Sequence, residues 1–309
     1  MAATGAVPAA AEDSSNVRAM WVWDTDTLMA SESDREAFLD AAGRLRLTEA
    51  FLYLRADDYT ARDRRLAALL AALARLDVRA WGMEGWRGYF SDVDGPVGLY
   101  AAADAMIAYN GRHRRGFAGF HSDLEPQDGQ GVGDNRFTNG VAESQLSPMQ
   151  LSARDGLLAE WLGIHAALRA KTAAAGLDYG AALPDWVDNY EGEPVTVGWQ
   201  GGRHSLLRRL LGVVPQYVVM SYNTNPTKVV ERVRGELRAA DAGGVPRIVF
   251  GLETHAGAGV NVSYADTPGK RHRARVMADI EKIATAITDH PSYLGWAIHD
   301  WQGWQTLPP

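Results

Sequence analysis

Residues 117–126 read Phe117-Ala118-Gly119-Phe120-His121-Ser122-Asp123-Leu124-Glu125-Pro126, an apolar strand that ends in two carboxylates one residue apart. Side chains alternate across a strand, so His121, Asp123 and Glu125 point to the same side as Gly119. Because unpaired buried carboxylates are costly, this pattern predicts a core strand that leaves the core at a functional site. An ordinary salt-bridge network at a strand end is the alternative.

Seven further apolar strands alternate with helical patterns, which is typical of repeated βα units around a parallel sheet. With the opening stretch as the fourth, the strands are expected at 19–23, 50–54, 78–83, 178–183, 216–222, 247–252 and 293–298. A Ser-x-x-Glu capping box at Ser33 predicts one helix start, and Ser147-Pro148 predicts another. Eight such units over residues 19–309 predict an α/β protein with one (β/α)8 TIM barrel. An open doubly wound sheet is less favoured, because neither Gly-rich phosphate fingerprint occurs.

Nearly every expected strand carries polar or aromatic residues at its C-terminal end, where barrels of this kind build their active sites. These positions predict a concave acidic mouth with aromatic walls. The candidate substrate-binding residues are Asp24, Trp86, His121, Asp185, Trp186, Asn223, His255, His299, Asp300 and Trp301, with packing and helix capping as the alternative for each. The Gly-rich segment 127–146 directly follows the fourth strand and is expected to shape the cleft.

The composition excludes several classes of function. The formal net charge of -7 and the lack of a basic stripe argue against a nucleic-acid partner. No apolar run has the length of a membrane span, so no membrane partner is expected. A monomer is expected rather than an oligomer. The absence of cysteine excludes disulfides and thiolate catalysis.

The first 18 residues are expected to form a flexible tail before the barrel domain. Val7-Pro8-Ala9-Ala10-Ala11 is similar to the small-residue cleavage zone of an export signal. This segment predicts a secreted protein, with an Ala-rich tail on a cytoplasmic protein as the alternative.

The strand ends do not predict a metal or another cofactor. A catalytic zinc site needs three or more converging ligands, whereas His121, His255 and His299 lie singly on different strands. No G-x-S-x-G elbow for a nucleophilic serine occurs either. Two carboxylates acting on a glycosidic bond fit better, because one can protonate the leaving oxygen while a second group stabilises or attacks the anomeric carbon. Glu125 is the expected acid.

The opening stretch resembles the fourth-strand D-G-x-D-x-D-x-E motif of glycoside hydrolase family 18, the chitinases and related endo-N-acetylglucosaminidases. Gly119, Asp123 and Glu125 match this motif, while Ala118 and His121 stand where the family has acids. Met220-Ser221-Tyr222-Asn223 is similar to the sixth-strand M-x-Y-D motif, and Trp296 or Trp301 would correspond to the floor of the sugar subsite. The resemblance implies a retaining hydrolase in which the substrate's N-acetyl group attacks, oriented by Asp123 and Tyr222.

A second resemblance is to the large clan of retaining barrels that use glutamates on strands four and seven. It is carried by Glu125-Pro126 and Glu253, although Leu124 replaces the Asn that precedes the acid in that clan. This resemblance implies that Glu125 is the acid/base, Glu253 the covalent nucleophile and Tyr222 its hydrogen-bonding neighbour. A non-catalytic carbohydrate-binding barrel is the remaining alternative, against which the intact Glu125 argues.

Overall fold

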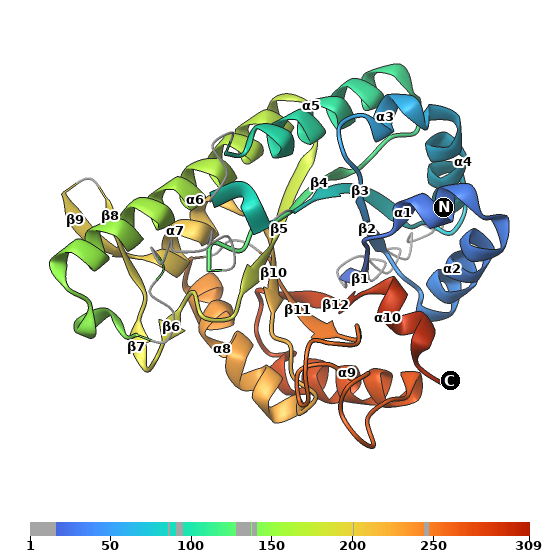
Figure 1. The fold of residues 1–309 in the computed structure, drawn as a ribbon. Helices are drawn as coiled ribbons and strands as arrows, with labels where there is room; N and C mark the ends of the chain where they lie inside the picture. Colours follow the sequence, from blue (N-terminus) through green and yellow to red (C-terminus); the bar gives the residue numbers. More distant parts are fainter. Residues whose placement is uncertain are drawn as a thin grey trace, which may run out of the picture.

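A closed barrel of eight parallel strands forms the centre of the protein (Figure 1). The structure is a computed structural model that describes residues 17–85, 87–90, 95–127, 137, 141–199, 201–243 and 247–309. The barrel strands are β1 (Val17–Val22), β2 (Glu49–Tyr53), β3 (Arg79–Glu84), β4 (Gly119–Asp123), β5 (Asp178–Pro184), β10 (Gln216–Met220), β11 (Arg247–Glu253) and β12 (Tyr293–His299). Closure through the pairing of β1 with β12 confirms the single TIM barrel predicted from the alternating pattern.

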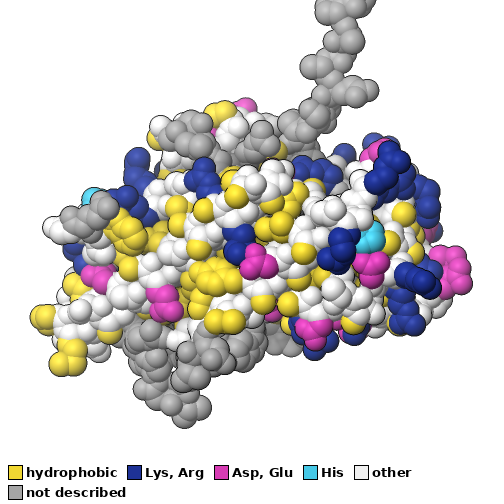
Figure 2. All heavy atoms as spheres, turned by 90° about the horizontal axis from the view of Figure 1, so that it is seen from above, with side chains coloured by type: hydrophobic (Ala, Val, Ile, Leu, Met, Phe, Trp, Pro, Cys, Tyr) yellow, Lys and Arg dark blue, Asp and Glu magenta, His cyan; other side chains and the backbone are white. Residues whose placement is uncertain are grey.

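Helices cover the outside of the barrel (Figure 1). They are α1 (Thr25–Ala30), α2 (Glu32–Leu45), α3 (Asp58–Ala61), α4 (Asp63–Ala74), α5 (Val97–Arg112), α6 (Pro148–Ala174), α7 (Leu206–Val213), α8 (Pro226–Gly243), α9 (Arg273–Ile287) and α10 (Trp301–Thr306), with 3-10 turns η1 (Arg87–Phe90) and η2 (Glu143–Gln145). No helix among the described residues is both long and apolar enough to cross a membrane. Figure 2 shows basic and acidic side chains interspersed with apolar ones on one outer face.

Two helix starts test the capping patterns in the sequence. Ser147 caps α6 as predicted, because its hydroxyl accepts from the Gln150 backbone N–H and the Gln150 side chain accepts from the Ser147 N–H. The start predicted at Ser33 was wrong by two residues. Ser31 caps α2 instead, since its hydroxyl accepts from the Asp34 N–H directly after α1 ends.

The barrel begins slightly earlier than predicted. β1 starts at Val17, whose partner on β12 is Gly295, two residues before the start predicted for the first strand at Ala19. Residues 1–16, which carry most of the predicted tail and the export signal, lie outside the described residues. The same holds for residues 128–136 and 138–140 of the segment predicted to shape the cleft.

Large aromatic side chains fill the barrel interior. Trp21 and Phe51 pack edge-on with ring centroids 5.4 Å apart, and Phe51 packs on Trp81 at 6.1 Å. Gly119 makes room for the Trp81 ring, because a Cβ at this position would lie 2.5 Å from a ring carbon. The floor beneath the strand ends is therefore packed with side chains and is not an open pore.

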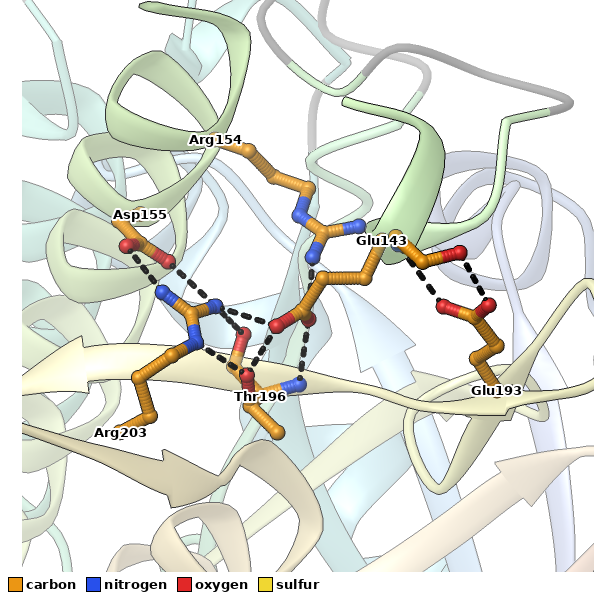
Figure 3. A network of polar contacts seen from close by, with 7 residues as sticks. Glu143, Arg154, Asp155, Glu193, Thr196 and Arg203 are labelled. Carbon is orange, nitrogen blue, oxygen red and sulfur yellow. Dashed lines mark hydrogen bonds and ion pairs between the residues drawn. The ribbon is translucent and has the colours of Figure 1, made fainter. Parts of the chain in front are cut away.

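The connection from β5 to α7 holds two small antiparallel sheets that the sequence did not predict. They are formed by β6 (Asn189–Tyr190) with β7 (Glu193–Pro194), and by β8 (Thr196–Trp199) with β9 (Gly202–Ser205). Figure 3 shows how polar side chains tie β8 and β9 to α6 and η2. Glu143 accepts from the Thr196 backbone N–H at 3.1 Å and forms ion pairs with Arg154 and Arg203.

We expect Glu143→Ala to lower the free energy of unfolding by about 3 kcal/mol. The Arg154 side chain is only 2% exposed, so the substitution leaves a buried guanidinium without the carboxylate that it contacts. Urea unfolding measures the change. Glu193→Ala is the matched control, because Glu193 accepts from Ser144 at the surface and its loss should change stability little. Equal losses in both variants would contradict a special role for the contact between Glu143 and the buried Arg154.

Glu236 on α8 is a buried carboxyl group outside the strand ends. It is 0% exposed, and neither carboxylate oxygen has a hydrogen-bond partner among the described residues. Burial, with a smaller contribution from Asp188, raises the pKa of Glu236 well above its usual range. The folded protein therefore holds a proton here that the unfolded chain releases above its ordinary pKa of 4.5.

We expect this group to make the protein less stable as the pH rises. Between the unfolded and the raised folded pKa the folded state binds more protons, so the free energy of unfolding falls by up to about 1.4 kcal/mol per pH unit. Glu236→Gln removes this titration. Denaturant unfolding of both proteins between pH 5 and 8 should show the variant gaining stability over wild type as the pH rises, and parallel curves would contradict the expectation.

Candidate active site

One cavity of about 610 Å³ lies at the C-terminal ends of the barrel strands. It is lined by Trp23, Gly85, Asp123, Glu125, Met220, Tyr222, Glu253, His255, Ala258, His299 and Asp300. Residues two apart on one strand face the same side, which explains why Asp123 and Glu125, like Met220 and Tyr222, reach it together. A larger hollow of about 820 Å³ lies on the outer side, against α1, α3 and α4, and contains neither Glu125 nor Glu253. The cavity at the strand ends is therefore the candidate active site.

The fourth strand supplies two carboxyl groups to this cavity. Asp123 ends β4, Glu125 follows it, and both are half-buried. Glu125 Oε2 accepts from Gln127 Nε2 at 2.8 Å. Gly85 lies against Asp123, because a Cβ at position 85 would come within 2.7 Å of the Asp123 Cβ. The small residue after β3 thus lets the two strand ends approach closely.

Glu253 stands at the end of β11, opposite His299 of β12 in the parallel register. It is 4% exposed. Its Oε1 accepts from the His255 backbone N–H at 2.6 Å, and its Oε2 lies 2.9 Å from His299 Nδ1, at an angle outside that of a hydrogen bond. These two contacts hold the carboxylate at the cavity wall.

His299 lies between Glu253 and the indole of Trp23, which follows the last residue of β1. Trp23 Nε1 donates to His299 Nε2 at 2.7 Å, which requires a lone pair on that nitrogen. The single proton of the neutral ring then sits on Nδ1, on the side of Glu253. Burial by itself lowers the pKa of His299, but the charges of Glu253, Asp300 and Asp123 outweigh it and raise the pKa to about 8.

Asp300 is a buried residue of the cavity lining that also caps a helix. Its Oδ1 accepts from the Gly303 N–H at 2.7 Å and so caps α10. The same oxygen lies 3.2 Å from Nδ1 of His255, whose side chain is 54% exposed. The peptide bond between His299 and Asp300 is cis.

The phenol of Tyr222 is affected by the charges of four carboxylates in the cavity. Burial raises the pKa of its phenol well above the usual range, and Glu253, Asp123, Glu125 and Asp300 add to this effect in that order. Its ring lies 5.5 Å from the ring of His299. Tyr222 is therefore a neutral hydroxyl group among the carboxylates at any pH near neutrality.

Glu84, at the end of β3, is a second carboxyl group with an altered pKa. Burial and then the charge of Asp123 raise its pKa to about 7, and its Oε2 accepts from the Tyr89 hydroxyl. A carboxyl group that titrates near neutrality beside a catalytic cavity is a common feature of acid/base sites.

His121 lies inside the barrel below the cavity and is not among the lining residues. It is fully buried and stacks on Phe51 with centroids 3.9 Å apart. Neither ring nitrogen has a hydrogen-bond partner among the described residues, and burial lowers its pKa to about 3. The structure thus places His121 as a neutral packing residue, which is the alternative given for it in the sequence analysis.

Five other predicted substrate-binding residues lie outside the cavity lining. Asp24 caps α1, Asp185 pairs with Arg232 at 3.1 Å, and Asn223 accepts from the Asn225 N–H. Trp186 packs on Phe137, and Trp301 packs on Phe38. Trp296, suggested with Trp301 as the floor of a sugar subsite, is buried on the helix side of β12. Trp86 lies outside the described residues.

The predicted site residues do not include Gly85, Met220, Ala258 and Trp23 of the cavity lining, and of these only Trp23 has a hydrogen-bond donor in its side chain. The pattern that could have identified it is the alternation along the first strand, since Trp21 faces the barrel interior and Trp23 follows two residues later. No group of three or more His, Asp and Glu side chains within the described ranges is placed to hold a metal ion.

The fold and site define a class of protein, the (β/α)8 barrels with an acidic cavity at their strand ends. We compared the chain with known proteins to find which barrels of this class it is similar to. No protein-family model matches the sequence, and no curated protein matches it. Solved structures do match. A GH18 chitinase mutant from Cycas revoluta in complex with (GlcNAc)4 covers 93% of this chain and 95% of its own, at 12% identity and a TM-score of 0.54.

A second structure, of GH18 chitinase from Cycas revoluta in complex with (GlcNAc)3, covers 93% of this chain and 95% of its own at 11% identity, with a TM-score of 0.53. At such low identity the likeness concerns the fold alone. It shows that this chain has a GH18-like TIM barrel, which confirms the fold implied by the resemblance of the fourth-strand motif.

Proposed function

We propose that the protein is a retaining glycoside hydrolase that acts on an oligo- or polysaccharide, with Glu125 as general acid/base. The observation that carries this proposal is the convergence of Asp123, Glu125 and Glu253 with Tyr222 on one cavity at the strand ends. An acid and a second carboxyl group on one cavity are what hydrolysis of a glycosidic bond requires. The GH18-like fold supports the same conclusion, since the matched chitinases were solved with GlcNAc oligomers.

We expect Glu125→Gln to keep the fold and ligand binding but to lower kcat roughly 10² to 10⁴-fold, because general acid catalysis is lost. Release of reducing ends from an unactivated polysaccharide measures the effect. Asp40→Asn is a matched control, because Asp40 is an exposed carboxylate on α2 paired with Arg44. A Glu125→Gln enzyme with wild-type rate would overturn the assignment, and ligand binding without any turnover in wild type would indicate a carbohydrate-binding barrel.

Two groups can attack or assist at the anomeric carbon. In the first version the substrate's own acetamido group attacks, Asp123 and Tyr222 orient it, and Glu253 binds sugar. The position of Tyr222 among the carboxylates and the GH18-like fold support this version. In the second version Glu253 is a covalent nucleophile, which its position on the wall of the same cavity supports.

Azide rescue separates the two versions. If Glu253 is the nucleophile, azide should restore activity to Glu253→Ala and yield a glycosyl azide of inverted configuration, while Asp123→Ala is not rescued. If the acetamido group attacks, neither variant yields that product, and only substrates with an N-acetyl group are cleaved. Product configuration by NMR gives the readout.

A further inference from the structure

We propose that Trp23 is a positioning residue for Glu253, acting through His299. Its indole N–H holds His299 in the tautomer whose Nδ1 proton lies on the side of the Glu253 carboxylate. The positioning role rests on the proposed function, because it requires that Glu253 acts in the cavity. The contact between the indole and the imidazole is given by the geometry and does not depend on that function.

The pairing of β1 with β12 brings these side chains together. Met20 lies opposite Ile298 in the parallel register, so Trp21 lies opposite His299. Trp23, two residues after Trp21, faces the same side and contacts His299 from there. Trp23 Nε1 lies 2.7 Å from His299 Nε2. On the other side of the ring, Nδ1 lies 2.9 Å from Glu253 Oε2, and the backbone N–H of His255 holds Oε1. The three side chains form one contiguous chain of contacts that ends in the cavity.

Two opposing influences act on the imidazole. Among the described residues, the carboxylates that favour its charged form are Glu253 on β11, Asp300 next to it and Asp123 on β4. Tyr222 faces the ring as a neutral phenol, and Trp21 of β1 and Trp23 directly after β1 place indole rings against it. Trp23 favours the neutral form, because protonation of Nε2 would place two N–H groups head to head at 2.7 Å. Loss of the Trp23 donor should therefore raise the pKa of His299, and loss of the Glu253 charge should lower it.

Trp21 provides the matched control. Its ring lies 5.5 Å from that of His299, against 6.0 Å for Trp23, and both meet the imidazole edge-on. Trp21 Nε1, however, has no hydrogen-bond partner among the described residues. Replacing either indole by a phenyl ring removes a neighbouring aromatic N–H, but only at Trp23 does it remove a donor to His299.

NMR of ¹⁵N-labelled histidine tests the proposal without reference to activity. In wild type above the pKa, His299 should carry its proton on Nδ1. Trp23→Phe should raise the His299 pKa by about half a unit to one unit, the size expected for one net hydrogen bond. Trp21→Phe should leave the pKa in place, and Glu253→Gln should lower it. The proposal is overturned if the uncharged His299 ring of wild type, observed above its pKa, carries its proton on Nε2, or if Trp23→Phe leaves the pKa unchanged. The wild-type tautomer decides even if a variant fails to fold.

Kinetics then connect the contact to the reaction. With hydrolysis measured across pH, Trp23→Phe should move the limb of the pH profile that reports His299 upward by the same amount as the NMR titration. Trp23→Tyr, whose hydroxyl can donate a hydrogen bond, should return this limb of the pH profile toward its wild-type position. If the NMR results hold but no glycoside is cleaved by wild type, the proposed function fails while the positioning contact stands. An NMR shift with an unchanged pH profile in an active enzyme would show that Trp23 does not act through His299 on the reaction.

Discussion

The parallel pairing of β1 with β12 is the constraint on which the rest of the structure depends. It joins the two ends of the chain, so that residues 276 positions apart, Trp23 and His299, share a hydrogen bond. It also turns an open sheet into a barrel whose strands all end on one face. The cavity exists because of this closure, since its lining comes from strands at both ends of the chain.

Packing below the cavity gives the strand ends a rigid base. Trp21, Phe51 and Trp81 fill the barrel interior, and His121 stacks among them as a neutral ring. His121 has no hydrogen-bond partner in the part of the chain that the structure describes. It can be buried there because burial lowers its pKa to about 3, so that no charge enters the interior at neutral pH. The site therefore differs from the family-18 motif where His121 replaces an acid. The carboxyl group that interacts electrostatically with Asp123 comes from the neighbouring strand, as Glu84.

The side chains of Glu253, Asp300 and Tyr222 line the cavity, and each makes different interactions. Glu253 is held by a backbone N–H and by His299, Asp300 caps α10, and Tyr222 remains a neutral hydroxyl group. Farther from the cavity, the buried Arg154 and the partly buried Glu143 anchor the connection between β5 and α7. Rigid support of this kind matters because small displacements of catalytic groups reduce rates strongly.

The sequence by itself determined the barrel and the acids at the ends of its fourth and seventh strands. Period-2 alternation in short apolar runs and helical patterns between them are local properties, and they specify which residues of one strand share a face. Only the tertiary structure decided which of the strand-end residues meet. Asp185, Trp186 and Trp301 occupy strand ends like Glu253 but pack or pair elsewhere, while Trp23 reaches His299. The reason is that register, barrel closure and the course of each loop arise from contacts between distant segments, which no local pattern contains.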